Sequence, residues 1–175
     1  MDNEKMDLKS CMRSIPDFPT EGILFWDITP LLANAEALSA AIDGLTAPFK
    51  DKGVDIVAAV EARGFIFGSA VARALGAGFV PIRKKGKLPY QTHAVSYGLE
   101  YGKDTIEVHT DAIKPGSNVL MVDDLLATGG TVAAACKLIE MLGGNIVGLT
   151  FLIELAQLAG REKLNKYMIH SVMTI

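Results

Sequence analysis

Two adjacent carboxylates, Asp123 and Asp124, stand between an apolar run and a turn rich in small residues. The run over 119–122 is typical of a buried strand that ends at the carboxylates, and the turn over 127–131 leads into a segment with helical spacing of apolar residues. Such a turn directs unpaired backbone N–H groups and the positive end of a helix at one point, which suits a phosphate. The carboxylates beside it can accept hydrogen bonds from sugar hydroxyls or help to hold a hydrated cation. The pattern therefore predicts a site for a phosphorylated ribose.

The turn matches neither of two common phosphate-binding motifs. No Gly-Lys-Ser/Thr follows 128–131, so it is not a Walker loop, and Gly76 and Gly78 are followed by no third glycine at dinucleotide-binding spacing. An ordinary strand–turn–helix without a ligand is the alternative. Like charges such as Asp123 and Asp124 are unfavourable side by side unless hydroxyls, cations or solvent satisfy them, which favours the ligand site.

The elements that must position this motif alternate along the chain between apolar runs and helical patterns. This alternation predicts an α/β fold with a mainly parallel central sheet flanked by helices. A loop over 14–30, rich in Pro and Gly, precedes the first helix, and Asn34 is placed to cap that helix. The expected strands are 55–60, 78–83, 118–123, 146–153 and 167–172, and the expected helices are 35–49, 64–75, 131–142 and 156–164.

Charged residues follow three of the predicted strands, in the segment 61–64, at 83–84 and at 123–124. Ligands bind outside the carboxyl ends of the strands in such sheets, so these segments are expected to converge on one mouth. Arg63 stands just after a buried strand, which favours a site role over a plain surface charge. The basic run over 83–87 is equally consistent with a solvated surface and with binding of a polyanion.

Size and charge narrow the function classes. At 175 residues, half of them hydrophobic, the chain is expected to form one globular domain over 1–175. A net charge of −3 gives no support for nucleic-acid binding, which usually needs a basic face. No early apolar stretch resembles a signal peptide and no run reaches membrane-spanning length, so a cytoplasmic protein without membrane partners is expected.

Cysteines and histidines offer no metal centre. Cys11 and Cys136 lie far apart in the sequence, and Cys136 falls on the apolar face of a predicted helix, where a small core residue is expected. His93, His109 and His170 share no metal-ligand spacing.

Six segments together resemble, in order, the motifs of the type I phosphoribosyltransferase family, and more specifically those of its adenine phosphoribosyltransferases. The resemblance covers nearly the whole chain and implies a loop over the base, called the hood, at about 14–32, and a flexible flap at about 84–105. A hairpin around 94–97 and 105–108 is expected within the flap. The segments are 16–19 (PDFP), 27–32 (DITPLL), 61–65 (EARGF), 83–89 (RKKGKLP), 97–102 (YGLEYG) and 119–131 (VLMVDDLLATGGT).

The resemblance implies a reaction of purine salvage. The 5-phosphoribosyl group of 5-phospho-α-D-ribose 1-diphosphate, the donor, would pass to adenine and give AMP and diphosphate. Mg²⁺ would arrive on the donor and be held mainly through substrate oxygens, with no protein metal cage. A homodimer is expected. A phosphoribosyltransferase for another nucleobase and a non-catalytic regulator that senses the donor are the alternatives.

The resemblance also implies roles for single residues. Asp123 and Asp124 would bind the ribose hydroxyls. Glu100 would exchange a proton with adenine as a general acid and base, and Tyr101 would line the closing flap. The 5-phosphate would be bound by Ala127, Thr128, Gly129, Gly130 and Thr131; the diphosphate by Arg63, Arg83, Lys84 and Lys87; and adenine by Leu24, Phe25 and Trp26.

The resemblance has three further implications for single residues. Arg63 would also act in catalysis at the diphosphate. Arg83 and Lys84 resemble residues at the family's dimer interface, where Arg83 can reach the partner's diphosphate site. Trp26 departs from the family pattern, which usually has Arg at this position, so adenine recognition there is expected to use the backbone.

Overall fold

A seven-stranded sheet is the frame of the second of two units into which the chain divides, Met1–Gly44 and Leu45–Ile175. The computed structural model describes residues 6–99 and 102–175. The single domain predicted over 1–175 stays a prediction. In their order across the sheet, the strands are β5 (Thr92–Leu99), β6 (Gly102–His109), β4 (Gly78–Lys84), β3 (Ile56–Val60), β7 (Asn118–Leu126), β8 (Asn145–Glu154) and β9 (Ile169–Thr174).

The centre of this sheet is parallel and one side is antiparallel. β3 pairs in parallel with β4 and β7, and β8 pairs in parallel with β7 and β9. β6 pairs antiparallel with β4 and β5, so β5 and β6 form the hairpin predicted within the flap. The predicted α/β fold with a mainly parallel sheet is therefore confirmed.

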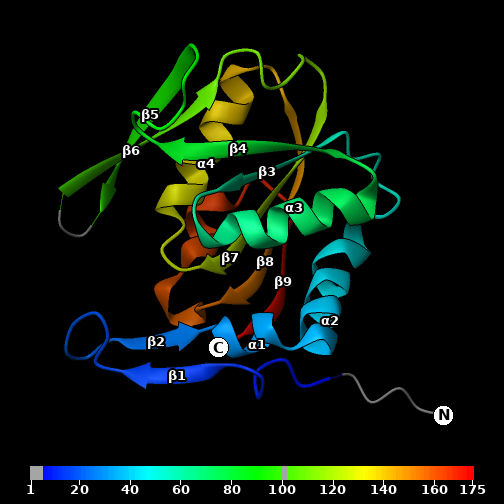
Figure 1. Cartoon of the computed structure of the whole chain (residues 1–175). Helices are drawn as coiled ribbons and strands as arrows, with labels where there is room; N and C mark the ends of the chain where they lie inside the picture. Colours follow the sequence, from blue (N-terminus) through cyan, green and yellow to red (C-terminus); the bar gives the residue numbers. More distant parts are fainter. Residues whose placement is uncertain (1–5, 100–101) are drawn as a thin grey trace. The chain divides into compact units, whose positions relative to one another are not determined.

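Two helices cover opposite faces of the sheet (Figure 1). On α3 (Arg63–Leu75), a Cβ added to Gly68 would lie 2.7 Å from the Cβ of Ala59 on β3. The preceding residue of β3, Ala58, belongs to the buried cluster that contains the apolar side chains of α4 (Gly130–Met141). Because successive side chains of a strand point to opposite faces, α3 and α4 lie on different sides of β3.

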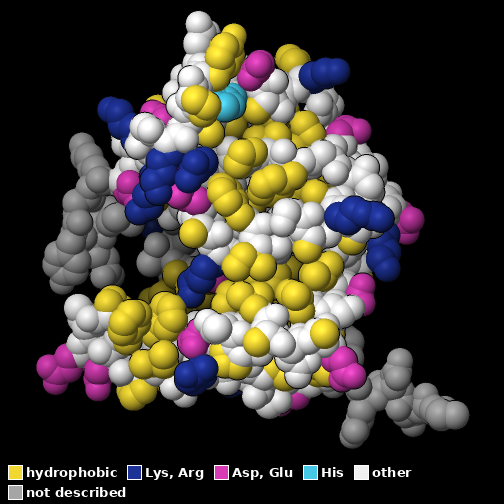
Figure 2. Space-filling model, in the orientation of Figure 1, with side chains coloured by type: hydrophobic (Ala, Val, Ile, Leu, Met, Phe, Trp, Pro, Cys, Tyr) yellow, Lys and Arg dark blue, Asp and Glu magenta, His cyan; other side chains and the backbone are white. Residues whose placement is uncertain are grey.

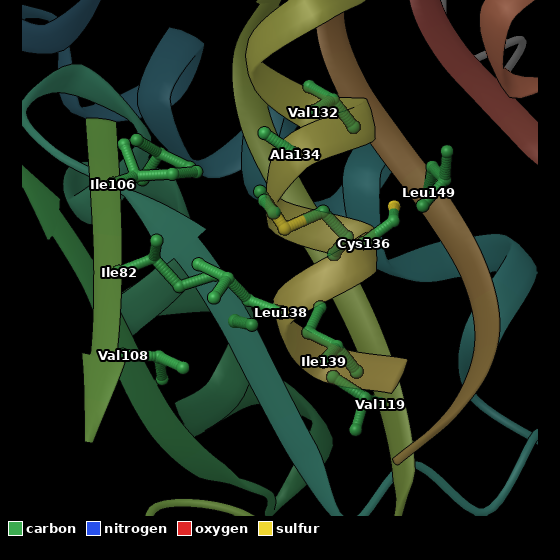
Figure 3. Close-up of a cluster of buried hydrophobic side chains, with 14 of the residues drawn as sticks. Ile82, Ile106, Val108, Val119, Val132, Ala134, Cys136, Leu138, Ile139 and Leu149 are labelled. Atoms are coloured by element: carbon green, nitrogen blue, oxygen red, sulfur yellow. The ribbon is translucent and has the colours of Figure 1, made fainter. Parts of the chain in front are cut away.

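The main core lies between α4 and the sheet (Figure 3). Leu138 and Ile139 of α4 are fully buried, as are Ile82 of β4 and Val119 of β7. Cys136 is buried among them, which confirms its predicted place in the core, and this burial raises the pKa of its thiol to about 12. The thiol is thus a neutral packing group.

The first unit contains a hairpin where a loop over 14–30 was predicted. β1 (Arg13–Pro16) pairs antiparallel with β2 (Leu24–Asp27). The connection is closed by the N–H of Phe18, which donates to the carbonyl of Ile23 at 3.2 Å. The loop prediction was wrong because Pro and turn residues conceal the short paired segments.

Helices follow the hairpin. α1 (Thr29–Ala33) precedes α2 (Ala35–Thr46), whose last residues belong to the second unit, and a single 3₁₀ turn, η1 (Ala47–Phe49), ends the segment. The predicted cap of α2 is confirmed, because the Asn34 side chain accepts hydrogen bonds from the N–H groups of Glu36 and Ala37, both at 3.0 Å.

The helix predicted over 156–164 is absent from the described structure. Two 3₁₀ helices, η2 (Ala156–Leu158) and η3 (Gly160–Leu164), stand there instead. Ala159 between them has a φ of 51°, a left-handed conformation that interrupts a continuous α-helix. Within residues 6–99 and 102–175, no helix is long and apolar enough to cross a membrane.

Candidate active site

A cavity of about 550 Å³ opens at the carboxyl ends of β3 and β7 in the second unit. It brings together three segments whose convergence was predicted from the strand ends: the start of α3, the end of β4 and the carboxylate motif. The lining residues are Val60, Glu61, Ala62, Arg63, Gly64, Lys84, Tyr97, Asp104, Ile106 and all positions from 123 to 132.

The sequence predicted that the two carboxylates stand at the end of their strand, but the structure places them within β7. Asp123 pairs with Phe151 of β8, and the pairing continues to Leu126, which lies opposite Glu154. The strand is longer than the apolar run suggests because β8 is long enough to supply partners beyond the carboxylates. As part of a paired strand, the carboxylates are held on a rigid element.

The carboxylate pair is buried and partly compensated by Arg63. Asp123 Oδ1 accepts a hydrogen bond from the N–H of Asp124 at 2.9 Å, and Asp124 Oδ2 lies 2.9 Å from Arg63 Nε. That Oδ2 atom is in ion-pair contact without being aligned as a hydrogen bond, so it retains capacity to accept one. A Cβ on Gly64 would lie 2.7 Å from Asp123 Oδ1, so any larger residue at this position would displace the carboxylate.

The same burial changes the acidity of both groups. Burial, together with the neighbouring charge of Asp124, raises the pKa of Asp123 well above its usual range. Burial also raises the pKa of Asp124, and the Arg63 guanidinium opposes this rise. A ligand that presents hydroxyl donors or a hydrated cation would compensate both groups.

The loop over 127–131 forms the next wall and leads into α4. Gly129 is the N-cap of α4 with a φ of 75°, and a Cβ at this position would lie 2.6 Å from the carbonyl oxygen of Gly160. Both the left-handed conformation and the close contact require Gly. The first backbone N–H groups of the twelve-residue helix α4 are therefore presented at the cavity, where they suit an anion.

Of the four cations predicted to bind diphosphate, the structure places two on the cavity wall and two beside it. Arg63 and Lys84 line the cavity. Arg83 Nε lies 3.4 Å and Lys87 Nζ 2.9 Å from the carboxylate of Glu61, and neither residue is part of the lining. Figure 2 shows basic side chains with acidic ones beside them at the place where β4 ends in Figure 1.

Glu61 and Asp104 are lining residues to which sequence reasoning gave no role. Glu61 also accepts a hydrogen bond from the N–H of Lys84 at 2.7 Å, and Asp104 Oδ2 lies 3.2 Å from Lys84 Nζ. Although burial opposes it, hydrogen bonds from Lys87 and Lys84 and the charge of Arg83 lower the pKa of Glu61. Glu61 precedes Arg63 in a motif, which was an available signal, whereas Asp104 reaches the site only through the pairing of β6 with β4.

The residues predicted to bind adenine lie on β2 in the first unit. Leu24 is half exposed, and Phe25 and Trp26 are partly buried. The ring of Phe25 packs edge-on against Phe18 at 5.1 Å between centroids, and Lys9 Nζ lies 5.5 Å from the centre of the Trp26 ring. In the described structure β2 forms a two-stranded sheet with β1. The predicted catalytic Glu100 and its neighbour Tyr101 lie outside the described residues.

The chain is similar in sequence to proteins of known family. A family model described as "phosphoribosyl transferase domain" matches residues 27–173. An adenine phosphoribosyltransferase from Rhodopirellula baltica is 56% identical over 170 residues, which are 97% of this chain and 82% of that protein.

Solved structures agree with the sequence comparison. The crystal structure of an adenine phosphoribosyltransferase from Thermoanaerobacter pseudethanolicus superposes with a TM-score of 0.93 at 50% identity, covering 96% of this chain and 98% of that one. The Giardia lamblia enzyme, complexed with 9-deazaadenine, has a TM-score of 0.91 at 40% identity over 97% of this chain and 96% of its own.

Proposed function

The chain belongs to the phosphoribosyltransferase family, among its adenine phosphoribosyltransferases, and on this premise we propose that it transfers the 5-phosphoribosyl group of the donor to adenine, giving AMP and diphosphate. The observation that carries the proposal is the buried pair Asp123 and Asp124 beside the N-terminus of α4, in one cavity with Arg63 and Lys84. Hydroxyl acceptors, a phosphate-binding helix end and cations for a second anion match the three polar parts of the donor.

The donor would be bound in three places. Asp123 and Asp124 accept hydrogen bonds from the ribose 2- and 3-hydroxyls. The loop over 127–131 binds the 5-phosphate through backbone N–H groups and the hydroxyls of Thr128 and Thr131. Arg63 and Lys84 bind the diphosphate, where Arg63 stabilises the negative charge that develops on the leaving group.

Arg83 and Lys87 would join the diphosphate from beside the cavity. Both side chains contact the carboxylate of Glu61, which lines the cavity. A change of side-chain rotamer would therefore bring either cation into the cavity. Closure of the flap would then exclude water, which otherwise competes with adenine for the ribose carbon.

The base would be recognised by the hood. Backbone groups of Leu24 and Trp26 bind the edge of adenine that carries N1 and the exocyclic amine, and Phe25 packs near the ring. Recognition through the backbone is compatible with Trp26, because it does not need the Arg that the family usually has at this position. Glu100 exchanges a proton at N7 as the bond at N9 forms.

Mg²⁺ would enter this site bound to oxygens of the donor. No group of three or more His, Cys, Asp or Glu side chains in 6–99 and 102–175 is arranged to hold a metal ion. The buried Asp124 Oδ2, which accepts no hydrogen bond from the part of the chain that the structure describes, supports a role in holding a hydrated cation together with the ribose hydroxyls. When bound, Mg²⁺ would neutralise charge on the leaving diphosphate.

Two further expectations accompany the proposal. A homodimer is supported by apolar side chains on the face where α3 lies (Figure 2), including Ile66, which is 42% exposed. The cytoplasmic location stays a prediction.

One assay separates the proposed function from its alternatives. The purified protein is given the donor, Mg²⁺ and, in turn, adenine, guanine, hypoxanthine or xanthine, and released diphosphate is measured. We expect release with adenine alone. Release with another base would identify a different phosphoribosyltransferase, and donor binding without release for any base would identify a regulator. Asp124→Asn is the control, because it should weaken donor binding without changing base preference.

A further inference from the structure

The loop that would bind the 5-phosphate is backed by a turn that lies outside the cavity. A Cβ on Gly129 would lie 2.6 Å from the carbonyl oxygen of Gly160, and a Cβ on Gly160 would overlap the carbonyl oxygen of Ala127. The two backbones are therefore in direct contact. Ala159, which precedes Gly160, is left-handed with a φ of 51°, so the turn has a specific shape that something else must maintain.

An ion pair between the half-exposed Arg161 and the buried Glu154 anchors this turn. Arg161 follows Gly160 and contacts Glu154 through two parallel bonds, Nε to Oε1 at 2.6 Å and Nη2 to Oε2 at 2.7 Å. The Ser171 hydroxyl donates to Glu154 Oε2 at 2.6 Å, and Arg161 Nη1 donates to the carbonyl of Ile169 at 3.3 Å. The side chain of Glu154 is only 9% exposed. Such a fork has a defined geometry and therefore fixes orientation as well as distance.

The anchor is connected to the loop at a second point. Glu154 lies opposite Leu126, the residue that precedes the loop, and the next N–H, that of Leu155, donates to the carbonyl of Leu126 at 2.9 Å. Glu154 thus fixes the start of the loop through β8 and its middle through Arg161 and Gly160. Neither Arg161 nor Glu154 lines the cavity.

We propose that Arg161 and Glu154 are a positioning pair that holds the backbone N–H groups of the loop over 127–131 in the geometry that binds the 5-phosphate. The inference rests on the proposed function of that loop. Backbone donors must be placed to within about 0.5 Å to be effective, and a loop held only by its own turn residues would not keep that precision. The pair acts on one end of the donor, because the diphosphate cations lie on α3, on β4 or just after β4.

The test compares ligands that carry a 5-phosphate with one that does not. Arg161→Gln removes the fork and Arg161→Lys keeps the charge but loses the parallel bonds. Gly160→Ala leaves the ion pair intact and displaces the turn from Ala127. For all three we expect weaker binding of ribose 5-phosphate and a higher KM for the donor, on the order of tenfold for Arg161→Gln and less for Arg161→Lys. Binding of diphosphate and kcat should change by less than about twofold.

Lys166→Gln is the matched control. Lys166 Nζ forms an ion pair with Glu140 at 2.8 Å on the surface, away from the cavity lining, so its loss should leave both ligands bound as before. Equal losses of ribose 5-phosphate and diphosphate binding, or no loss of either in folded Arg161→Gln, would overturn the proposal. Circular dichroism at the assay temperature establishes that each variant is folded.

The two binding measurements do not depend on catalysis. Ribose 5-phosphate and diphosphate binding are measured by calorimetry without any base, so they test the positioning pair even if the base panel gives no diphosphate release. Failure of wild-type protein to bind ribose 5-phosphate would instead contradict the proposed function itself.

Discussion

Arg63 Nε lies 2.9 Å from Asp124 Oδ2, so the side chain proposed to bind diphosphate also neutralises the carboxylate proposed to bind ribose. The two ends of the donor are thereby coupled through one guanidinium. The coupling acts on acidity, because Arg63 opposes the rise that burial causes in the pKa of Asp124.

Loss of this charge should move the pH dependence of donor binding. In Arg63→Gln the pKa of Asp124 rises further, so the carboxyl is protonated at a higher pH and the KM for the donor begins to rise at a higher pH as the solution is acidified. Arg63→Lys keeps the charge and should leave the pH profile in place even if affinity falls. The profile of the donor KM measures the shift, and unchanged profiles in both variants would contradict the coupling.

Asp123→Asn should stabilise the fold at neutral pH while weakening donor binding. The pKa of Asp123 is raised in the folded protein, so stability falls as pH rises from the unfolded-state pKa through the folded-state pKa, and the whole penalty is present above the latter. The amide removes this penalty and keeps the Oδ1 acceptor for the Asp124 N–H. Each kcal/mol recovered raises Tm by about 2–4 °C in a chain of this size.

Asp104→Asn is the matched comparison for this measurement. Although burial opposes it, hydrogen bonds from Thr105 and Lys84 lower the pKa of Asp104, so its ionised form contributes stability above the unfolded-state pKa and loses it as pH falls. This variant should therefore lower Tm at neutral pH. A lower Tm in Asp123→Asn as well would show that burial of that carboxylate carries no penalty.

Glu61→Gln should strengthen inhibition by diphosphate. The Glu61 carboxylate competes with diphosphate for Arg83 and Lys87, whereas the amide keeps an oxygen for the N–H of Lys84 and loses the charge. The pairs are partly exposed, so the inhibition constant should fall by roughly two- to fivefold and less at high salt. A rise in that constant would instead mean that Glu61 orients the two cations for the ligand.

Glu100→Gln should lower kcat with little change in donor affinity. A general acid–base contributes on the order of a hundredfold or more, and an amide of the same shape cannot exchange the proton. Steady-state kinetics with adenine and the donor give kcat and both KM values. The conservative replacement Glu100→Asp serves as a control that retains an acid, and wild-type turnover in Glu100→Gln would remove this residue from the reaction.

Removal of Mg²⁺ should abolish transfer reversibly. Dialysis against a chelator is expected to eliminate diphosphate release, and added Mg²⁺ should restore it in proportion to the Mg²⁺–donor complex, because the ion enters on substrate oxygens. Metal analysis of the dialysed protein, with ribose 5-phosphate binding as a check of folding, completes the measurement. A tightly retained metal ion would contradict a cation carried by the donor.

The carboxylate motif and the elements around it could be predicted because their signals are local. Periodicity located α4 and its core residue Cys136, and the side chain of Asn34 identified the start of α2. The end of β7 could not be predicted in this way, because its last residues, two carboxylates followed by two leucines, lack the alternation of polar and apolar residues that indicates a strand, and they are paired with β8.

Partners that lie far apart in the sequence were also beyond prediction. Glu61 contacts Lys87, twenty-six positions away, because β3 and β4 are neighbours in register. The left-handed Ala159 interrupts the predicted helix beside Gly160, whose backbone is in close contact with the loop at Gly129, and local helix propensity does not indicate this break. Residue types therefore indicated the chemistry of the site, and the pairing of strands determined which charges compensate one another.

Trp26 is the sole tryptophan of the chain, and it lies on β2 with the Lys9 ammonium over its ring. Its intrinsic fluorescence is consequently a single-site reporter of the hairpin that carries the proposed base contacts. Emission intensity and quenching by iodide can follow adenine titrations without an attached dye. A Lys9→Gln variant would show how much of the signal depends on the neighbouring cation.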